Sequence, residues 1–241
     1  MYKLIAVCLL AISTSLQAEQ SPLRFAVNDS WAMPMLRIEN DRAVGGILFD
    51  LQQRLAAKVG RRARFVVLPH MRVERALNAG EIDVRCYVNP TWNNIKHKRF
   101  VWTRPFMTQR DLLVSTKPSN AQVEDLYKER VGTVLGFNYP RLDSLFKGGQ
   151  IHREDARTQE QTLLKLVAGR FGYAITNERT FHWFNRQLSP DQQLHIHSVV
   201  ASVPVSCVVR DEPDVPTARL LRAMDEMALD GEFEEILNAY R

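Results

Sequence analysis

The chain has 241 residues, 45% of them hydrophobic and 24% charged, and carries a formal net charge of +5 at pH 7. This length allows one large or two small globular domains with proper cores. The basic residues are spread along the chain, and the cluster from Lys96 to Arg99 is too short to form the basic face that nucleic acids require. We therefore expect no nucleic-acid partner and only a mild preference for small anionic ligands.

Residues 1–18 have the layout of a secretory signal peptide. Lys3 precedes the apolar run from Leu4 to Ile12, and the following polar residues lead to Ala18, after which we expect cleavage. The apolar run is too short to cross a bilayer, which takes about 20 residues. We expect a soluble protein that is exported to the periplasm.

After the leader, short apolar runs alternate with an amphipathic helix. Leu23 to Val27 predict a buried first strand, and Asn28 to Trp31 place polar groups and an aromatic ring at its carboxyl end. A helix from Asp50 to Gly60 and a second strand from Arg64 to Leu68 follow. A strand, a helix and a strand joined by short links indicate a βαβ unit, so we expect mostly parallel sheets in an α/β fold.

The stretch from Arg72 to Phe106 predicts the third strand and the first place to look for a site. A short helix ends at Gly80, and apolar and polar residues then alternate with period 2, as in a half-buried strand. The apolar set is Ile82, Val84, Cys86 and Val88, and the polar set is Asp83, Arg85 and Tyr87. The loop from Asn89 to Lys96 lies at the carboxyl end of this strand, where open α/β sheets hold ligands.

A second lobe is expected at residues 113–200, and the chain then returns to the first lobe, residues 19–112 and 201–241. The second lobe offers Phe137-Asn138 at the start of a helix and Asn177 at the tip of a strand. Two strands that cross between lobes make a two-strand hinge.

Five segments, in this order, carry a resemblance to a known family. They are Gly46 to Leu51, Ala76 to Val84, Arg99 to Phe106, Val131 to Gly136 and Ala168 to Ile175. Together they resemble the type 2 periplasmic solute-binding proteins, and among these the family that serves polar amino acid ABC transporters. The resemblance implies a two-lobed α/β fold that closes around a small ligand and delivers it to an ABC permease. We expect a monomer without a cofactor.

The resemblance also assigns ligand contacts by position. In the amino acid binders of this family, a Thr-x-x-Arg after the third strand binds the α-carboxylate, and an Asp in the second lobe binds the α-ammonium group. These positions fall on Asn93, Lys96 and Asn177. Lys lacks the planar fork of Arg, and Asn lacks a carboxylate. The departures count against an ordinary zwitterionic amino acid and favour a small polar ligand that is anionic, amide-bearing or only amino-acid-like.

Nine residues at strand ends and in loops are candidates for ligand contacts. Trp31 could instead pack in the core, and Asn177 could instead cap the following helix. Arg72 could instead pair with Glu74 or Asp83, and Lys96 could be one more solvated charge. The candidates are Trp31, Arg72, Tyr87, Asn89, Thr91, Lys96, Phe137, Asn138 and Asn177.

Cys86 and Cys207 are the cysteines that remain after the leader, without a C-x-x-C spacing for metal or redox chemistry. Both fall in predicted strands of the same lobe, and an oxidising compartment permits a disulfide. Two buried free thiols are the simpler interpretation, because the sequence does not give the distance between the Cα atoms.

Catalytic motifs are absent from the sequence, which has no G-x-S-x-G, no H-E-x-x-H and no spaced Cys/His ligand set. We expect a binding protein and not an enzyme. Two alternatives use the same fold. One is a ligand-sensing subunit of a membrane sensor, and the other is a cyclohexadienyl dehydratase-like enzyme, which needs an acid such as Glu178 in the cleft.

Overall fold

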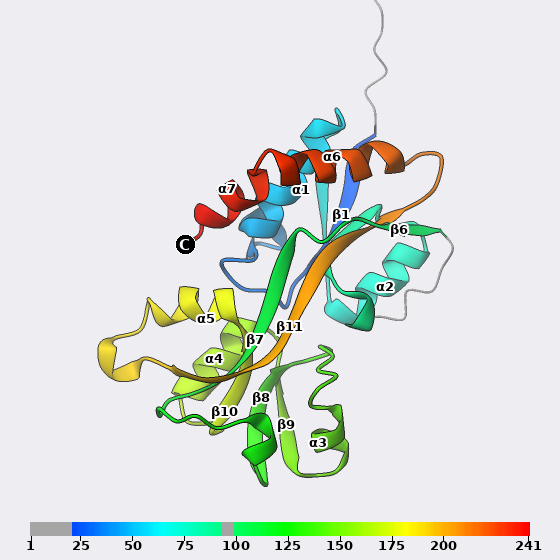
Figure 1. The fold of residues 1–241 in the computed structure, drawn as a ribbon. Helices are drawn as coiled ribbons and strands as arrows, with labels where there is room; N and C mark the ends of the chain where they lie inside the picture. Colours follow the sequence, from blue (N-terminus) through cyan, green and yellow to red (C-terminus); the bar gives the residue numbers. More distant parts are fainter. Residues whose placement is uncertain (1–20, 93–98) are drawn as a thin grey trace, which may run out of the picture.

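The computed structural model describes residues 21–92 and 99–241, which build two lobes of alternating strands and helices (Figure 1). The first lobe has a sheet of β1 (Leu23–Asn28), β4 (Ala63–Leu68) and β5 (Val84–Val88). Its helices are α1 (Ile47–Lys58), α2 (His70–Asn78), α6 (Thr217–Leu229) and α7 (Glu232–Asn238). Smaller elements are the hairpin of β2 (Arg37–Glu39) and β3 (Arg42–Gly45), and β6 (Phe100–Trp102). The expected signal peptide and Lys96 lie outside the described residues.

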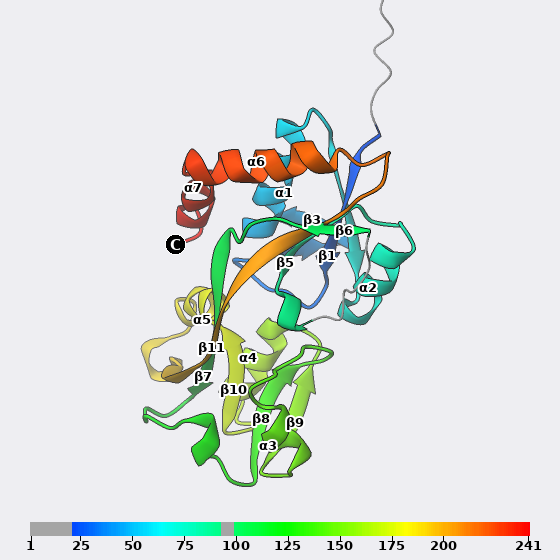
Figure 2. The same cartoon turned by 45° about the vertical axis from the view of Figure 1, so that its right-hand side comes forward.

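The second lobe repeats this plan with a sheet of β8 (Glu129–Val134), β9 (Ile151–Ala156) and β10 (Tyr173–Asn177). Its helices are α3 (Asp143–Lys147), α4 (Gln159–Val167) and α5 (Glu178–Asn185). Two long strands, β7 (Met107–Ser115) and β11 (His195–Arg210), run between the lobes (Figures 1 and 2). Single 3-10 turns span Pro90–Trp92, Val123–Asp125 and Pro190–Gln192. Among the described helices, none has the length and apolar character that a membrane span needs.

Parallel pairing is confined to the lobes. β1 pairs in parallel with β4 and β5, and β8 pairs in parallel with β9 and β10. β7 and β11 are antiparallel to each other, β11 is antiparallel to β5, and β7 is antiparallel to β10. The expectation of mostly parallel sheets therefore fits each lobe but not the crossing strands. The expected lobe boundaries, after residues 112 and 200, fall inside β7 and β11 and stay a prediction.

Helices cover both faces of each sheet. In the first lobe, α1, α6 and α7 pack on one face and α2 packs on the other. Strand β5 lies between β1 and β11 in this sheet, and all five of its residues are buried. The prediction of a half-buried strand is therefore wrong for β5, because Arg85 lies near His70 of α2 and the Tyr87 side chain meets Asn177 of the second lobe. These two polar side chains are held inside the protein.

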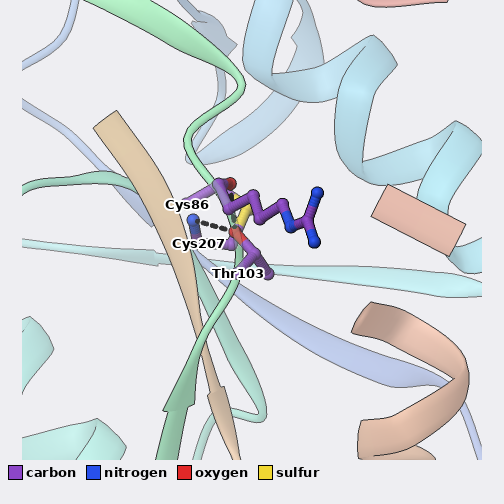
Figure 3. Close-up of a disulfide and its surroundings, with 4 residues drawn as sticks. Cys86, Thr103 and Cys207 are labelled. Carbon is purple, nitrogen blue, oxygen red and sulfur yellow. Dashed lines mark hydrogen bonds between the residues drawn. A yellow bond between two sulfur atoms is a disulfide. The ribbon is translucent and has the colours of Figure 1, made fainter. Parts of the chain in front are cut away.

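Cys86 in β5 and Cys207 in β11 form a disulfide with an S–S distance of 2.05 Å (Figure 3). The free-thiol interpretation is therefore wrong. The backbone N–H of Cys207 donates to the Thr103 hydroxyl at 2.9 Å, as Figure 3 shows. The strand register shifts between Ser206 and Cys207, and the neighbouring Tyr87 has a left-handed backbone with φ of 63°. The disulfide thus fixes the bulge from which the Tyr87 side chain projects.

Asp83 joins three strands of the first lobe through charged hydrogen bonds. Its carboxylate accepts from the backbone N–H of Arg24 at 2.9 Å and from the Arg24 Nε at 3.0 Å, and it also accepts from the Arg210 Nη2 at 2.8 Å. Burial alone would raise the pKa of this carboxyl, but the hydrogen bonds from Arg24 and Arg210 outweigh it and hold the pKa below its usual value. The charged form of Asp83 therefore stabilises the fold.

The disulfide gives the first prediction. Because it closes a loop with a sequence separation of 121 residues, its loss should lower the free energy of unfolding by about 2–5 kcal/mol. Urea denaturation with and without dithiothreitol measures this difference. The double variant Cys86→Ser/Cys207→Ser should show the lower stability in both buffers. A wild-type protein that is equally stable in both buffers, with the disulfide reduced in one, would contradict the prediction.

The Asp83 contacts give the second prediction. Asp83→Asn should lower the free energy of unfolding at pH 7 by about 2–3 kcal/mol, because two guanidinium groups lose their carboxylate. The folded-state pKa is depressed, so this contribution is present above the usual Asp pKa and is lost as pH falls below it. Urea titrations at pH 7 and pH 3 should therefore show the difference between wild type and variant shrinking. Asp211→Asn, at an exposed position, serves as the control.

Candidate functional site

A cavity of about 50 Å³ lies between the two lobes. Ligand pockets usually measure about 300–1,000 Å³, so this space holds only a few water molecules. Its walls come from β5, the start of α2, β7, β10 and the segment after β8. The lining residues are Trp31, His70, Arg85, Tyr87, Trp92, Gln109, Asp111, Phe137, Asn138, Tyr139, Gln159, Ile175, Thr176 and Asn177. We call this space the inner cavity.

Three hydrogen bonds join the lobes around the inner cavity. The Asn177 amide nitrogen donates to the Tyr87 hydroxyl at 2.7 Å, and the Asn138 amide nitrogen donates to the Trp92 carbonyl at 2.7 Å. The backbone N–H of Gln159 donates to the Ser30 carbonyl at 3.1 Å. Opening the lobes must break these bonds, so they set part of the free-energy difference between open and closed forms.

Five of the nine candidate residues line the inner cavity together. Asn177 has both of the roles considered for it, since its side-chain oxygen caps α5 by accepting from the backbone N–H groups of Arg179 and Thr180, while its amide nitrogen reaches Tyr87. Trp31 is buried and packs edge-on against the Tyr87 ring, with 5.8 Å between ring centroids. The five are Trp31, Tyr87, Phe137, Asn138 and Asn177.

Three other candidates lie elsewhere. Arg72 is exposed and lines an outer groove of about 800 Å³, which shares Trp31 and His70 with the inner cavity. The Asn89 amide nitrogen donates to the Pro204 carbonyl at 2.6 Å, and the Asn89 side-chain oxygen accepts from the Thr91 N–H and hydroxyl. Asn89 and Thr91 therefore shape the turn after β5 and do not line the inner cavity. The ninth candidate, Lys96, lies outside the described residues.

Arg85 is a buried cation in the wall of the inner cavity that the sequence analysis did not select. Burial lowers the pKa of its guanidinium to about 10, against a small opposing effect of Glu74, so it stays charged at neutral pH. Burial and the charge of Arg85 lower the pKa of the nearby His70 to about 4. The His70 Nδ1 lies 2.6 Å from the Asn28 amide nitrogen, which fits a neutral ring with its proton on Nε2.

Asp111, in the crossing strand β7, is an acid in the wall of the same cavity. Burial raises the pKa of its carboxyl to about 6, against the hydrogen bond that it accepts from the Gln109 amide at 2.8 Å. Burial, and after it the charge of Asp111, also raises the pKa of Tyr87. A carboxylate in this position lacks the solvation that it has in water, so a cationic group beside it would be bound favourably.

Two buried polar atoms in the wall of the inner cavity have no hydrogen-bond partner among residues 21–92 and 99–241. They are the side-chain oxygen of Gln159 and the hydroxyl of Thr176. Buried polar groups without partners cost about 1–3 kcal/mol each, so a polar molecule that satisfied them would recover this free energy.

These groups left only weak signals in the sequence. An Arg between Val84 and Cys86 in an apolar strand is unusual, and it marks the cavity once β5 is recognised as a central strand. Asp111 opens an apolar run in the crossing strand, which is also an uncommon place for a carboxylate. Gln159 and Thr176 gave no signal, because polar residues are ordinary in the first turn of a helix and at the end of a strand.

The raised pKa of Asp111 gives the third prediction. Asp111→Asn should raise the free energy of unfolding at pH 7.5 by up to about 3 kcal/mol, because burial raises the pKa from 3.8 to about 6 and each pKa unit corresponds to about 1.4 kcal/mol. A carboxyl with a raised folded-state pKa destabilises the fold as pH rises from its usual value through about 6. The gain should therefore largely vanish at pH 3, where the carboxyl is mostly protonated in both states. Urea denaturation at both pH values measures this gain. A variant that is no more stable than wild type at pH 7.5 would contradict the prediction.

Solved structures with the same fold come from several kinds of protein. An ancestral arginine-binding protein bound to arginine is 19% identical, with 92% of this chain and 99% of that chain covered and a TM-score of 0.74. A histidine kinase sensor domain similar to periplasmic binding proteins is 17% identical, with coverages of 92% and 96% and a TM-score of 0.74. An ancestral amino acid-binding protein, a precursor of cyclohexadienyl dehydratase, is 17% identical, with coverages of 91% and 95% and a TM-score of 0.74.

At these identities the structures show a shared fold. A search of curated proteins finds no match. The model of one protein family, in contrast, matches residues 23–241, which is almost all of the described chain. The two lobes, the crossing strands and this match lead to one conclusion. The chain belongs to the bacterial extracellular solute-binding proteins, family 3.

Proposed function

We propose that this protein is a periplasmic receptor that closes its two lobes around a small zwitterion of the amino acid type. The observation that carries the proposal is that a cation, Arg85, and an acid, Asp111, line the same cavity from different strands. In this proposal Arg85 binds the anionic group of the ligand and Asp111 binds its ammonium group. The charges that the resemblance led us to seek at Lys96 and Asn177 are thus supplied from β5 and β7.

The other walls suit a ligand with polar ends and a small body. Gln159 and Thr176 can complete the hydrogen bonds of a polar group. Trp31, Tyr87 and Phe137 exclude water from the charged contacts, which strengthens them. Arg72 in the outer groove is placed to attract the anionic group of the ligand before the ligand enters the inner cavity.

Closure follows from contacts on both sides of the inner cavity. Arg85 and Tyr87 belong to the first lobe, while Gln159 and Asn177 belong to the second. A ligand that touches both sets binds the closed form better than the open form and shifts the population towards closure. Because the inner cavity is small, it favours a ligand with few atoms beyond its charged groups. A larger ligand would require a closed form in which the lobes lie slightly further apart.

Delivery to an ABC permease is the proposed use of the closed form, and a role in sensing is the second candidate. The structural likeness to a histidine kinase sensor domain favours the second candidate. Permease and ATPase genes beside the gene for this protein would support transport, and a sensor kinase gene would support signalling.

Catalysis is not favoured by the position of Glu178. This acid forms an ion pair with Arg110 at 2.6 Å and does not line the inner cavity. Incubation with prephenate or arogenate tests the point directly, and formation of an aromatic product would replace the receptor proposal with an enzymatic one.

A matched ligand screen gives the fourth prediction. Each amino acid is compared by thermal shift with the amine that lacks its carboxylate and the acid that lacks its ammonium group. A ligand that uses both Arg85 and Asp111 should raise the melting temperature by mass action, while both partial molecules bind at least about tenfold more weakly. Equal binding of the acid and the amino acid would remove Asp111 from the site.

Variants then identify which cation binds the anionic group of the ligand. Calorimetry should show a loss of at least about tenfold in affinity for Arg85→Gln and for Asp111→Asn, but little change for Lys96→Ala. Asp111→Asn is expected to be the more stable protein, so its loss of affinity cannot come from unfolding. A large loss in Lys96→Ala with Arg85→Gln unaffected would instead assign the anion contact to the loop after β5.

A further inference from the structure

A second groove between the lobes, of about 410 Å³, lies between α5 and the C-terminal segment that follows α7. Both ribbon views place α5 opposite this end of the chain (Figures 1 and 2). Pro34, Tyr240 and Arg241 form one wall, and residues of α5 and its C-cap, Arg186, form the other. The groove shares no lining residue with the inner cavity. We call it the α5 groove.

The α5 groove is strongly basic. Arg179, Arg186 and Arg241 line it, together with His182. Its one acid, Glu178, is already bound by Arg110 at 2.6 Å. In the part of the chain that the structure describes, no carboxylate lies within ion-pair distance of the three arginines. The three arginines therefore have no ion-pair partner among the described residues, and Glu178 acts on Arg179 only from a longer distance.

The positions of two of these arginines are restricted. The guanidinium of Arg186 lies over the Trp183 ring, 5.1 Å from its centroid, and Trp183 in turn contacts Tyr240 of the first lobe, with 6.4 Å between ring centroids. Arg179 is half-buried, and burial together with the charge of Arg241 lowers its pKa. Planar guanidinium groups held in place suit the oxygens of a small anion.

We propose that the α5 groove binds a small oxyanion, of the class of phosphate, sulfate or a short dicarboxylate, between Arg179, Arg186 and Arg241. Because its walls come from both lobes, the bound anion stabilises the closed form. Asn177 connects the two sites, since it caps α5 and donates to the Tyr87 hydroxyl in the inner cavity. The three arginines would bind the anion whichever ligand enters the inner cavity.

Inorganic phosphate at constant ionic strength tests the proposal. At pH 7.5, replacing chloride by phosphate should raise the melting temperature of the wild-type mature protein by several degrees, and the double variant Arg179→Gln/Arg186→Gln should lose this shift. A matched double variant, Arg75→Gln/Arg222→Gln, removes two exposed helix arginines elsewhere and should keep it. A shift that persists without Arg179 and Arg186 would be the general effect of phosphate on apolar burial, and would overturn the proposal.

Two further measurements locate the anion. The indole N–H resonance of Trp183, assigned with Trp183→Phe, should move as phosphate is added, and it should not move in the Arg179→Gln/Arg186→Gln variant. Arg85→Gln, in the inner cavity, should keep the phosphate shift in melting temperature. Loss of the shift in Arg85→Gln alone would place the phosphate in the inner cavity and refute the α5 groove, whatever ligand the receptor carries.

Discussion

The antiparallel pairing of β7 with β11 is the constraint on which both lobes depend. Residues Met107 to Ser115 pair with Val205 to His195, while β11 also pairs with β5 of the first lobe and β7 with β10 of the second. β7 also pairs with β10, which sets Asp111 directly opposite Asn177. The acid of the inner cavity and the cap of α5 are therefore neighbours because of strand register, and the hinge itself supplies part of the site. A shift of this register would separate them.

Several features around the inner cavity lower the free energy of unfolding. Asp111 is desolvated, Gln159 and Thr176 carry polar atoms without partners, and Tyr87 has a backbone conformation that non-glycine residues rarely adopt. The surrounding sheets and the Asp83 contacts hold these features in place. Such a distribution is common in proteins that bind ligands, because groups arranged for a ligand are poorly satisfied without it. The free energy of ligand binding includes the relief of these costs.

The fold was predictable from local patterns, while the charges of the site were not. Apolar runs, turn residues and five short motifs led to two lobes, and strand ends led to Trp31, Tyr87 and Asn177. Arg85 was missed because its surroundings depend on β11, which pairs with β5 from more than a hundred residues away. Arg72 lies at the start of α2 in the outer groove, which residues of both lobes line. The ligand roles of all these residues, and of Lys96, stay predictions.

The disulfide joins the chain just before it leaves the first lobe to the strand that brings it back. Cys86 and Cys207 enclose every helix and strand of the second lobe, so that lobe is a closed covalent ring attached to the first. A single proteolytic cut inside the ring would leave both fragments linked. In a compartment that contains proteases, the connection between the lobes would outlast a single cut anywhere between Cys86 and Cys207.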